Sequence, residues 1–168
     1  MGFSQSFINW IKILYNGIES TVLINGHLGN YFNVNRGVRQ GCPLSMILYA
    51  ISQEPLYQAI KQTKQIDPLD IPCKPIKLLG YADNTTIFIK SDLGIIFVFT
   101  ILKHFEIASG IKLNTHKTKI FGFGLWHDRK YWPYDNIKIE SKEITILGIT
   151  FSNKLNDAIK ISWSKCHL

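Results

Sequence analysis

Two strand-like runs separated by a short polar turn constrain the fold of this chain more than any other feature. The runs are residues 76–81 and 85–90, and both are rich in β-branched and aromatic side chains, which favour extended backbone. Between them lie Ala82, Asp83 and Asn84, and an Asp-Asn pair is typical of turns. The pattern predicts a tight β-hairpin with the carboxylate of Asp83 projecting from its tip.

A carboxylate at a hairpin tip is well placed for a metal ligand, because the paired strands fix the backbone while the side chain projects outward. Magnesium prefers hard oxygen ligands, and nucleotidyl transfer uses two such ions. The next residue is Asn84, and its neutral amide is a weaker ligand than a carboxylate. A plain surface turn is the alternative interpretation, and the tetrapeptide alone does not decide between the two.

A second segment, RGVRQGCPLS at residues 36–45, places two arginines just before a predicted helix start at Pro43. The planar guanidinium group suits phosphate oxygens, and a helix N-terminus adds backbone amide donors. Gly41 has no Cβ, so a base or sugar has room to approach its backbone. A capped loop entering a helix is the alternative interpretation of this segment.

The first part of the chain predicts a helix followed by a hairpin. Apolar residues recur at helical spacing over residues 3–14, with Ser4 as the N-cap and Gly17 just past the end. Residues 20–25 and 31–34 read as two strands, with turn residues at 25–26 and 29–30 between them.

The helix that begins at Pro43 is expected to be long, and Pro55 should kink or divide it. The apolar face predicted for it comprises Leu44, Ile47, Leu48, Ile51, Leu56 and Ile60. Residues 62–75 are polar and proline-rich, which indicates a loop, and residues 93–109 read as a helix stopped by Gly110. Further strands are expected at residues 118–123, 137–139 and 145–151, so the order of elements predicts an α+β fold.

Composition favours a globular protein with a polyanionic partner. The chain has 19 Lys+Arg against 12 Asp+Glu, a formal net charge of +7, which suits nucleic acid. The three cysteines form no paired-ligand motif, so we expect reduced thiols in an intracellular protein rather than a zinc site. No apolar run has the length of a membrane span, and we expect no membrane partner.

In combination, the segments resemble the reverse transcriptases of non-LTR (LINE-like) retrotransposons. Residues 36–45 match that family's motif B, and LLGYADNTTIF at 78–88 matches motif C, which usually reads YADD. Residues 109–114 together with Lys117 are similar to motif D, and residues 146–149 resemble the LGI segment near the primer grip. The resemblance implies a partial palm domain over residues 1–151, with 152–168 as a tail or the start of a thumb or connection.

The resemblance also implies a palm-like antiparallel sheet packed on helices, a Mg²⁺ cofactor, and an RNA template with a DNA primer as partners. Asp83 would be a magnesium ligand, and Lys117 would assist the departure of pyrophosphate, with Lys112 as the alternative. The residues expected to contact template or nucleotide are Arg36, Arg39, Gln40 and Gly41, of which the last two would line the nucleotide pocket.

The chain departs from the family pattern before motif B. The family has an earlier strand, motif A, with the first metal-binding aspartate, whereas the first aspartate here is Asp67. The only acid before residue 36 is Glu19, and the segments of the fingers are also missing. Asn84 also replaces the second acid of motif C. Of the three metal-binding acids that the family pattern contains, we therefore expect only Asp83 to remain. The isolated chain is therefore expected not to polymerise, to leave an apolar sheet edge unpaired, and to need the N-terminal part of a longer polymerase.

Two other interpretations stay open. The chain is alternatively a non-catalytic nucleic-acid-binding module, in which bases stack on the aromatic residues of segment 121–134. The residues of that segment that suit nucleic acid are Trp126, His127, Arg129, Lys130, Tyr131, Trp132 and Tyr134. The same segment also fits a partly buried apolar loop. The last alternative is a truncated gene product without a selected function.

Overall fold

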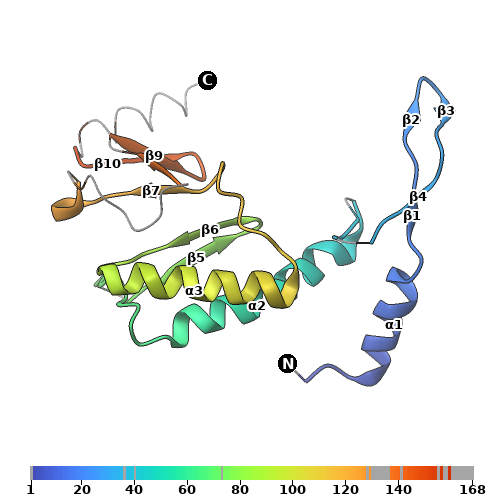
Figure 1. Ribbon diagram of the computed structural model, residues 1–168, viewed down its shortest axis with the longest axis horizontal. Coiled ribbons are helices and arrows are strands. Elements are labelled where there is room, and N and C mark those ends of the chain that lie inside the picture. The colour runs from blue at the N-terminus through green and yellow to red at the C-terminus, as the bar shows by residue number, and fades with distance from the viewer. Residues whose placement is uncertain are drawn as a thin grey trace. The chain divides into compact units, whose positions relative to one another are not determined.

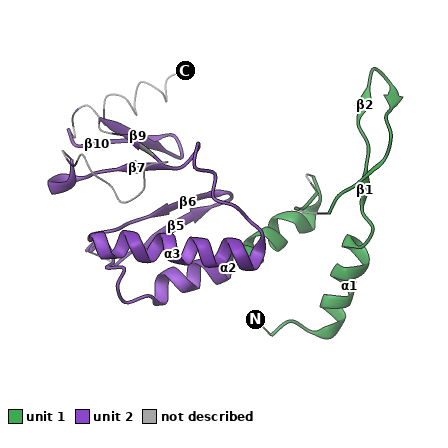
Figure 2. Cartoon of the chain, in the orientation of Figure 1, with its two compact units in different colours: residues 1–53 green, residues 54–168 purple. Residues whose placement is uncertain are grey.

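The computed structural model describes residues 2–35, 37–39, 41–72, 74–127, 129, 137–140, 142–154, 156 and 159. The chain forms two compact units, residues 1–53 and 54–168, and the division falls inside a helix (Figure 2). Helices and short strands are mixed in both units (Figure 1), which agrees with the predicted α+β class. The predicted boundary at residues 151/152 stays a prediction, since most residues after 154 lie outside the described ones.

The first helix, α1 (Gln5–Tyr15), begins and ends where the sequence predicts. The Ser4 side chain accepts a hydrogen bond of 3.3 Å from the N–H of Phe7, which satisfies a free donor of the first turn. None of the residues of α1 is buried, and Trp10 and Ile13 are 64% and 67% exposed. The apolar face of this helix is therefore open in the described part of the chain.

The hairpin predicted after α1 is confirmed, with its pairing in two short pieces. Strand β1 (Glu19–Ser20) pairs antiparallel with β4 (Phe32–Asn33), and β2 (Leu23–Ile24) pairs antiparallel with β3 (His27–Leu28). Asn25 and Gly26 have φ angles of 50° and 82°, and two successive positive φ angles define the type I′ turn that suits a two-residue hairpin loop.

Helix α2 (Pro43–Gln62) runs through Pro55 as one element, so the proline does not divide it. Leu56 and Ile60 are buried as predicted. The prediction for Ile47 is wrong, because this side chain is 54% exposed. Helical periodicity identifies an apolar face, but it does not say over what length another element covers that face.

The core of the second unit lies between α2, α3 (Asp92–Ser109) and the hairpin of β5 (Leu78–Tyr81) and β6 (Asn84–Ile87) (Figure 1). Gly110 ends α3 with φ +72°, as predicted, and the helix begins at Asp92, one residue before the predicted start, with Ser91 as its N-cap. Ile66 is fully buried in this core although it lies in the loop 62–75 that the sequence indicates as polar. One apolar residue in a polar stretch therefore anchors that loop.

The remaining strands form two small sheets. β7 (Lys119–Phe121) pairs in parallel with β8 (Lys138–Glu140), and β9 (Glu143–Ile146) pairs antiparallel with β10 (Ile149–Ser152). The prediction of one strand over residues 145–151 is wrong, because Leu147 and Gly148 have φ angles of 50° and 84° and turn the chain back. A short 3-10 helix, η1 (Gly124–Trp126), follows β7.

All the strand pairs of the described residues are two-stranded sheets, four antiparallel and one parallel. The prediction of one palm-like antiparallel sheet is therefore confirmed only in the antiparallel pairing of neighbouring strands. The described strands do not join into one sheet. Both outer edges of the β5–β6 hairpin are without a strand partner in this set. No helix among the described residues has the length and apolar character that crossing a bilayer requires.

Candidate active site

The β5–β6 hairpin places Asp83 at its tip. Tyr81 pairs with Asn84 across the two strands, so Ala82 and Asp83 alone form the turn. Ala82 has φ +49°, a left-handed conformation that is unfavourable for a residue with a Cβ. The predicted hairpin is therefore confirmed, with Asp83 exposed at the turn and Asn84 as the first residue of β6.

The donor atoms around the turn fit one ligand position rather than a two-metal centre. Asp83 supplies a carboxylate, and Asn84 supplies an amide oxygen in the position next to it. Within the described residues no three His, Cys, Asp or Glu side chains gather at one point. A two-metal mechanism needs several carboxylates that bridge both ions, so the described side chains do not by themselves hold the pair of ions that the family implies.

The segment 36–45 leads into α2, as predicted. The carbonyl of Arg39 accepts hydrogen bonds from the Ser45 hydroxyl at 2.5 Å and from the N–H of Cys42 at 3.3 Å, and its side chain is exposed. Gly41 has φ +82°, and a Cβ built there would meet no atom within 4 Å. Conformation therefore accounts for this glycine, and its open surroundings leave the predicted approach of a ligand untested. Arg36 and Gln40 lie outside the described residues.

Cys42 lies immediately before α2, and this position changes the pKa of its thiol. The pKa of its thiol is lowered, chiefly because the backbone N–H of Leu44 donates a hydrogen bond to it, while burial acts in the opposite direction. Free amides at a helix N-terminus stabilise the thiolate in this way. The same amides are the donors that the sequence predicted for a phosphate.

Lys117 lies in a turn organised by Asn114. The N–H of Lys117 donates to the side-chain oxygen of Asn114 at 3.2 Å, and the N–H of Thr118 donates to the Asn114 carbonyl at 2.9 Å. The side chains of Lys117 and Lys112 are both exposed. This geometry fixes the backbone at Lys117 and leaves both lysines as alternatives for the role in pyrophosphate departure.

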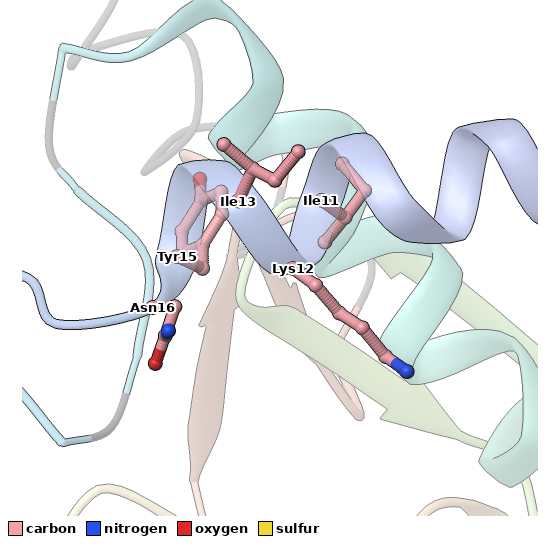
Figure 3. A pocket seen from close by; sticks show the side chains of 5 residues that line it. All are labelled: Ile11, Lys12, Ile13, Tyr15 and Asn16. Atoms are coloured by element: carbon pink, nitrogen blue, oxygen red, sulfur yellow. The ribbon is translucent and has the colours of Figure 1, made fainter.

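Two hollows lie in the first unit. One runs along the end of α1, where Lys12 extends away from Asn16 (Figure 3), and its walls hold no carboxylate. The other is lined by Ile18, Glu19, Ser20, Val34 and Arg39. Arg39 therefore lies beside a hollow that includes the single acid preceding motif B.

The segment 121–134 is described only up to residue 127 and at Arg129, so Lys130, Tyr131, Trp132 and Tyr134 lie outside the described residues. The guanidinium group of Arg129 lies 4.5 Å from the ring centre of Trp126 and forms an ion pair with Asp92. The Asn153 amide holds the same loop, since it donates to the Gly122 carbonyl at 3.0 Å and accepts from the N–H of Gly124 at 3.2 Å. One face of Trp126 is thus covered by protein, which favours the partly buried loop over a stacking platform.

Comparisons with known proteins identify the family of this chain. Residues 1–151 match the family model of reverse transcriptase (RNA-dependent DNA polymerase), and the chain belongs to this family. It is also similar to the transposon TX1 uncharacterized 149 kDa protein of Xenopus laevis, with 28% identity over 151 residues. The match covers 89% of this chain and 12% of the Xenopus protein, so the chain spans about an eighth of that relative's length.

Proposed function

We propose that this chain is part of the palm of a retrotransposon-type reverse transcriptase and that Asp83 is its metal ligand. The observation that carries the proposal is the position of Asp83 in a two-residue turn between paired strands, with its side chain exposed. The match to the reverse transcriptase family over residues 1–151 supports it. A carboxylate in this position would bind Mg²⁺, which would supply charge neutralisation at the reacting phosphate.

The proposed roles of residues outside the metal ligand set follow from the resemblance of their segments to the family's motifs. Arg39 would contact template or incoming nucleotide, because its exposed guanidinium group precedes a helix N-terminus. Arg36 would do the same, and Gln40 and Gly41 would line the nucleotide pocket. Lys117 would donate a proton to the departing pyrophosphate, or Lys112 would do so instead.

The isolated 168-residue chain would not polymerise. Asp83 is the one acid that it provides at the turn, and an amide stands beside it. The other carboxylates would come from the remainder of a longer polymerase, which the Xenopus relative supports because the match covers 12% of its length. The exposed apolar residues of α1 and of the β2–β3 hairpin would then pack against that remainder.

Primer extension tests this proposal. The purified chain is incubated with an RNA template, an annealed DNA primer, deoxynucleotides and Mg²⁺, beside an active reverse transcriptase as a positive control. No primer extension is expected, either from the natural chain or from Asn84→Asp, because a second acid at the turn does not replace the acid of motif A. Incorporation that Asp83→Ala abolishes would show that the chain is a complete catalyst and would overturn the claim of inactivity.

The claim of a longer polymerase has its own test, the reading frame upstream of codon 1 in the messenger RNA. The proposal would be supported by a continuous reading frame that encodes, upstream of residues 5–15, a strand rich in β-branched residues that contains an aspartate. A stop codon in all three frames just upstream of codon 1 would contradict it.

A further inference from the structure

The β5–β6 hairpin contacts the core of the second unit through one face. In a strand, alternate residues share a face, and Leu78 pairs with Ile87 while Gly80 pairs with Thr85. Leu78 and Ile87 pack on the core cluster that contains Leu56 and Ile60. The Gly80–Thr85 pair lies on the same face, one step closer to the turn.

Tyr57 of α2 contacts this second pair. Its hydroxyl lies 3.0 Å from Oγ1 of Thr85, and either oxygen can donate the hydrogen bond. Its ring lies against the backbone of Gly80, where an added Cβ would stand 2.5 Å from the Tyr57 hydroxyl and 2.8 Å from Cζ. A Cβ at position 80 would therefore force the Tyr57 ring to move, and glycine permits the close approach of the ring.

The Tyr57 contact fixes the Gly80–Thr85 pair, which is the second pair from the tip of the hairpin. Beyond Gly80 and Thr85 remain only the Tyr81–Asn84 pair and the turn of Ala82 and Asp83. No hydrogen bond or ion pair holds the Asp83 side chain to another described residue, so its position depends on the two strands that carry the turn. Leu79 and Tyr81, on the other face, are 52% and 67% exposed and give no support from that side.

We propose that Tyr57 is a positioning residue for Asp83, and that Gly80 and Thr85 are the surfaces on which it acts. Tyr57 lies in the part of α2 that belongs to the second unit, about one and a half turns before the end of the helix at Gln62. The Tyr57 contact therefore lets this part of α2 fix the two strands that carry the Asp83 turn. The functional part of this inference rests on the proposed role of Asp83 as a metal ligand, whereas the contact itself does not.

Amide hydrogen exchange in the 168-residue chain tests the contact. Tyr57→Phe retains the ring and removes the hydroxyl, and Thr85→Val removes the partner hydroxyl at constant shape. A hydrogen bond with a net contribution of about 1 kcal/mol predicts roughly fivefold faster exchange of the amides at 81–85 in either variant. Thr85→Ser retains a hydroxyl and should keep the slow exchange, while Thr86→Val alters the opposite face and serves as the matched control. Unchanged exchange in Tyr57→Phe would overturn the proposal.

The steric half of the contact predicts a compensating pair of substitutions. Gly80→Ala should speed exchange throughout residues 78–87, because the new methyl group displaces the Tyr57 ring. Tyr57→Ala in the same chain removes the obstructing ring and should restore part of the protection that Gly80→Ala removes. If Gly80→Ala does not fold, the double variant still decides the matter: a folded double variant supports the contact, and failure of both while Tyr57→Ala alone folds contradicts it.

Paramagnetic broadening by Mn²⁺ separates the positioning role from the proposed function. In the natural chain the signals of residues 82–84 should broaden first, and Tyr57→Phe should reduce this selectivity at least about twofold. Thr85→Ser should retain it. Faster exchange in Tyr57→Phe without any local broadening in the natural chain would support the contact and contradict Asp83 as a ligand. Selective broadening that Tyr57→Phe leaves unchanged would contradict the positioning role and leave the proposed function in place.

Discussion

Tyr81 and Asn84 face each other across the β5–β6 hairpin, and the chain reverses between them in two residues. This pairing leaves Asp83 no freedom to move along the strand, because a shift of one residue would transfer Leu78 and Ile87 from the core to solvent. The register that buries these two side chains is the register that exposes Asp83. The position of the carboxylate is therefore tied to the hydrophobic core of the second unit.

The left-handed conformation of Ala82 predicts that Ala82→Gly stabilises the second unit. The conformation at φ +49° costs alanine about 1 kcal/mol or more. Glycine avoids this strain but loses more conformational freedom on folding, which offsets part of the gain. A net gain of about 0.5 kcal/mol is expected in urea unfolding. Ala108→Gly, on an exposed position of α3, is the matched control and should lower the free energy of unfolding by about 1 kcal/mol. A loss of stability in Ala82→Gly would contradict the geometry of this turn.

Binding of RNA–DNA duplexes should depend on salt and on the charge of Arg39, which is proposed to contact template or nucleotide. Arg39→Gln is expected to reduce the slope of log affinity against log salt concentration by about 1 if its guanidinium group neutralises a phosphate of the template. Fluorescence anisotropy at several salt concentrations measures this slope. Lys64→Gln removes an exposed charge to which no role is assigned and serves as the control. Equal slopes for the natural chain, Arg39→Gln and the control would refute the template contact of Arg39.

The loop that carries Trp126 should affect stability rather than nucleic-acid affinity. Arg129 covers one face of the indole ring and pairs with Asp92, and Asn153 holds the loop from another side. Trp126→Leu is therefore expected to lower the free energy of unfolding by about 1 kcal/mol or more and to leave the affinity for single-stranded RNA within twofold. A large loss of RNA affinity in a variant of unchanged stability would instead favour the stacking module.

The lowered pKa of Cys42 predicts a pH dependence with a definite sign. A thiol whose folded-state pKa is lowered is stabilised as the thiolate by the native structure, chiefly through the N–H of Leu44. The free energy of unfolding should therefore rise as the pH increases through the folded-state pKa, and this gain should be absent from Cys42→Ala. In a Cys73→Ser/Cys166→Ser background, the alkylation rate should reach half its maximum at a lower pH in the folded chain than in urea. Equal midpoints would contradict the hydrogen bond.

The sequence predicted the elements that have strong local signals. Ser4 and Gly17 mark the ends of α1 and Gly110 marks the end of α3, because caps and left-handed glycines act within a few residues. Leu147 and Gly148 adopt positive φ angles like those of Asn25 and Gly26. Leucine, unlike asparagine, is not a typical turn residue, so the apolar run around it led to the prediction of a single strand. The exposure of Ile47 and the burial of Ile66 depend on neighbours distant in sequence, so periodicity alone does not predict either of them.

The candidate site was predicted in the same uneven way. Asp83 at a hairpin tip follows from the two strand-like runs and is confirmed. The Tyr57 contact was not predicted, because it joins residues 28 positions apart. Its one signal in the sequence is Gly80, since a glycine inside a strand often marks the close approach of another group.

Mn²⁺ affinity at the turn tests the central claim most directly, because it isolates the ligand from the rest of the polymerase. Titration of the chain with Mn²⁺, followed by the amide signals of residues 82–84, should show weak local binding that Asp83→Asn abolishes. Asn84→Asp should tighten this binding at least about tenfold, since a second carboxylate adds a full charge beside the first. Binding that is absent from the turn, or that persists in Asp83→Asn, would contradict the assignment of Asp83 as the metal ligand.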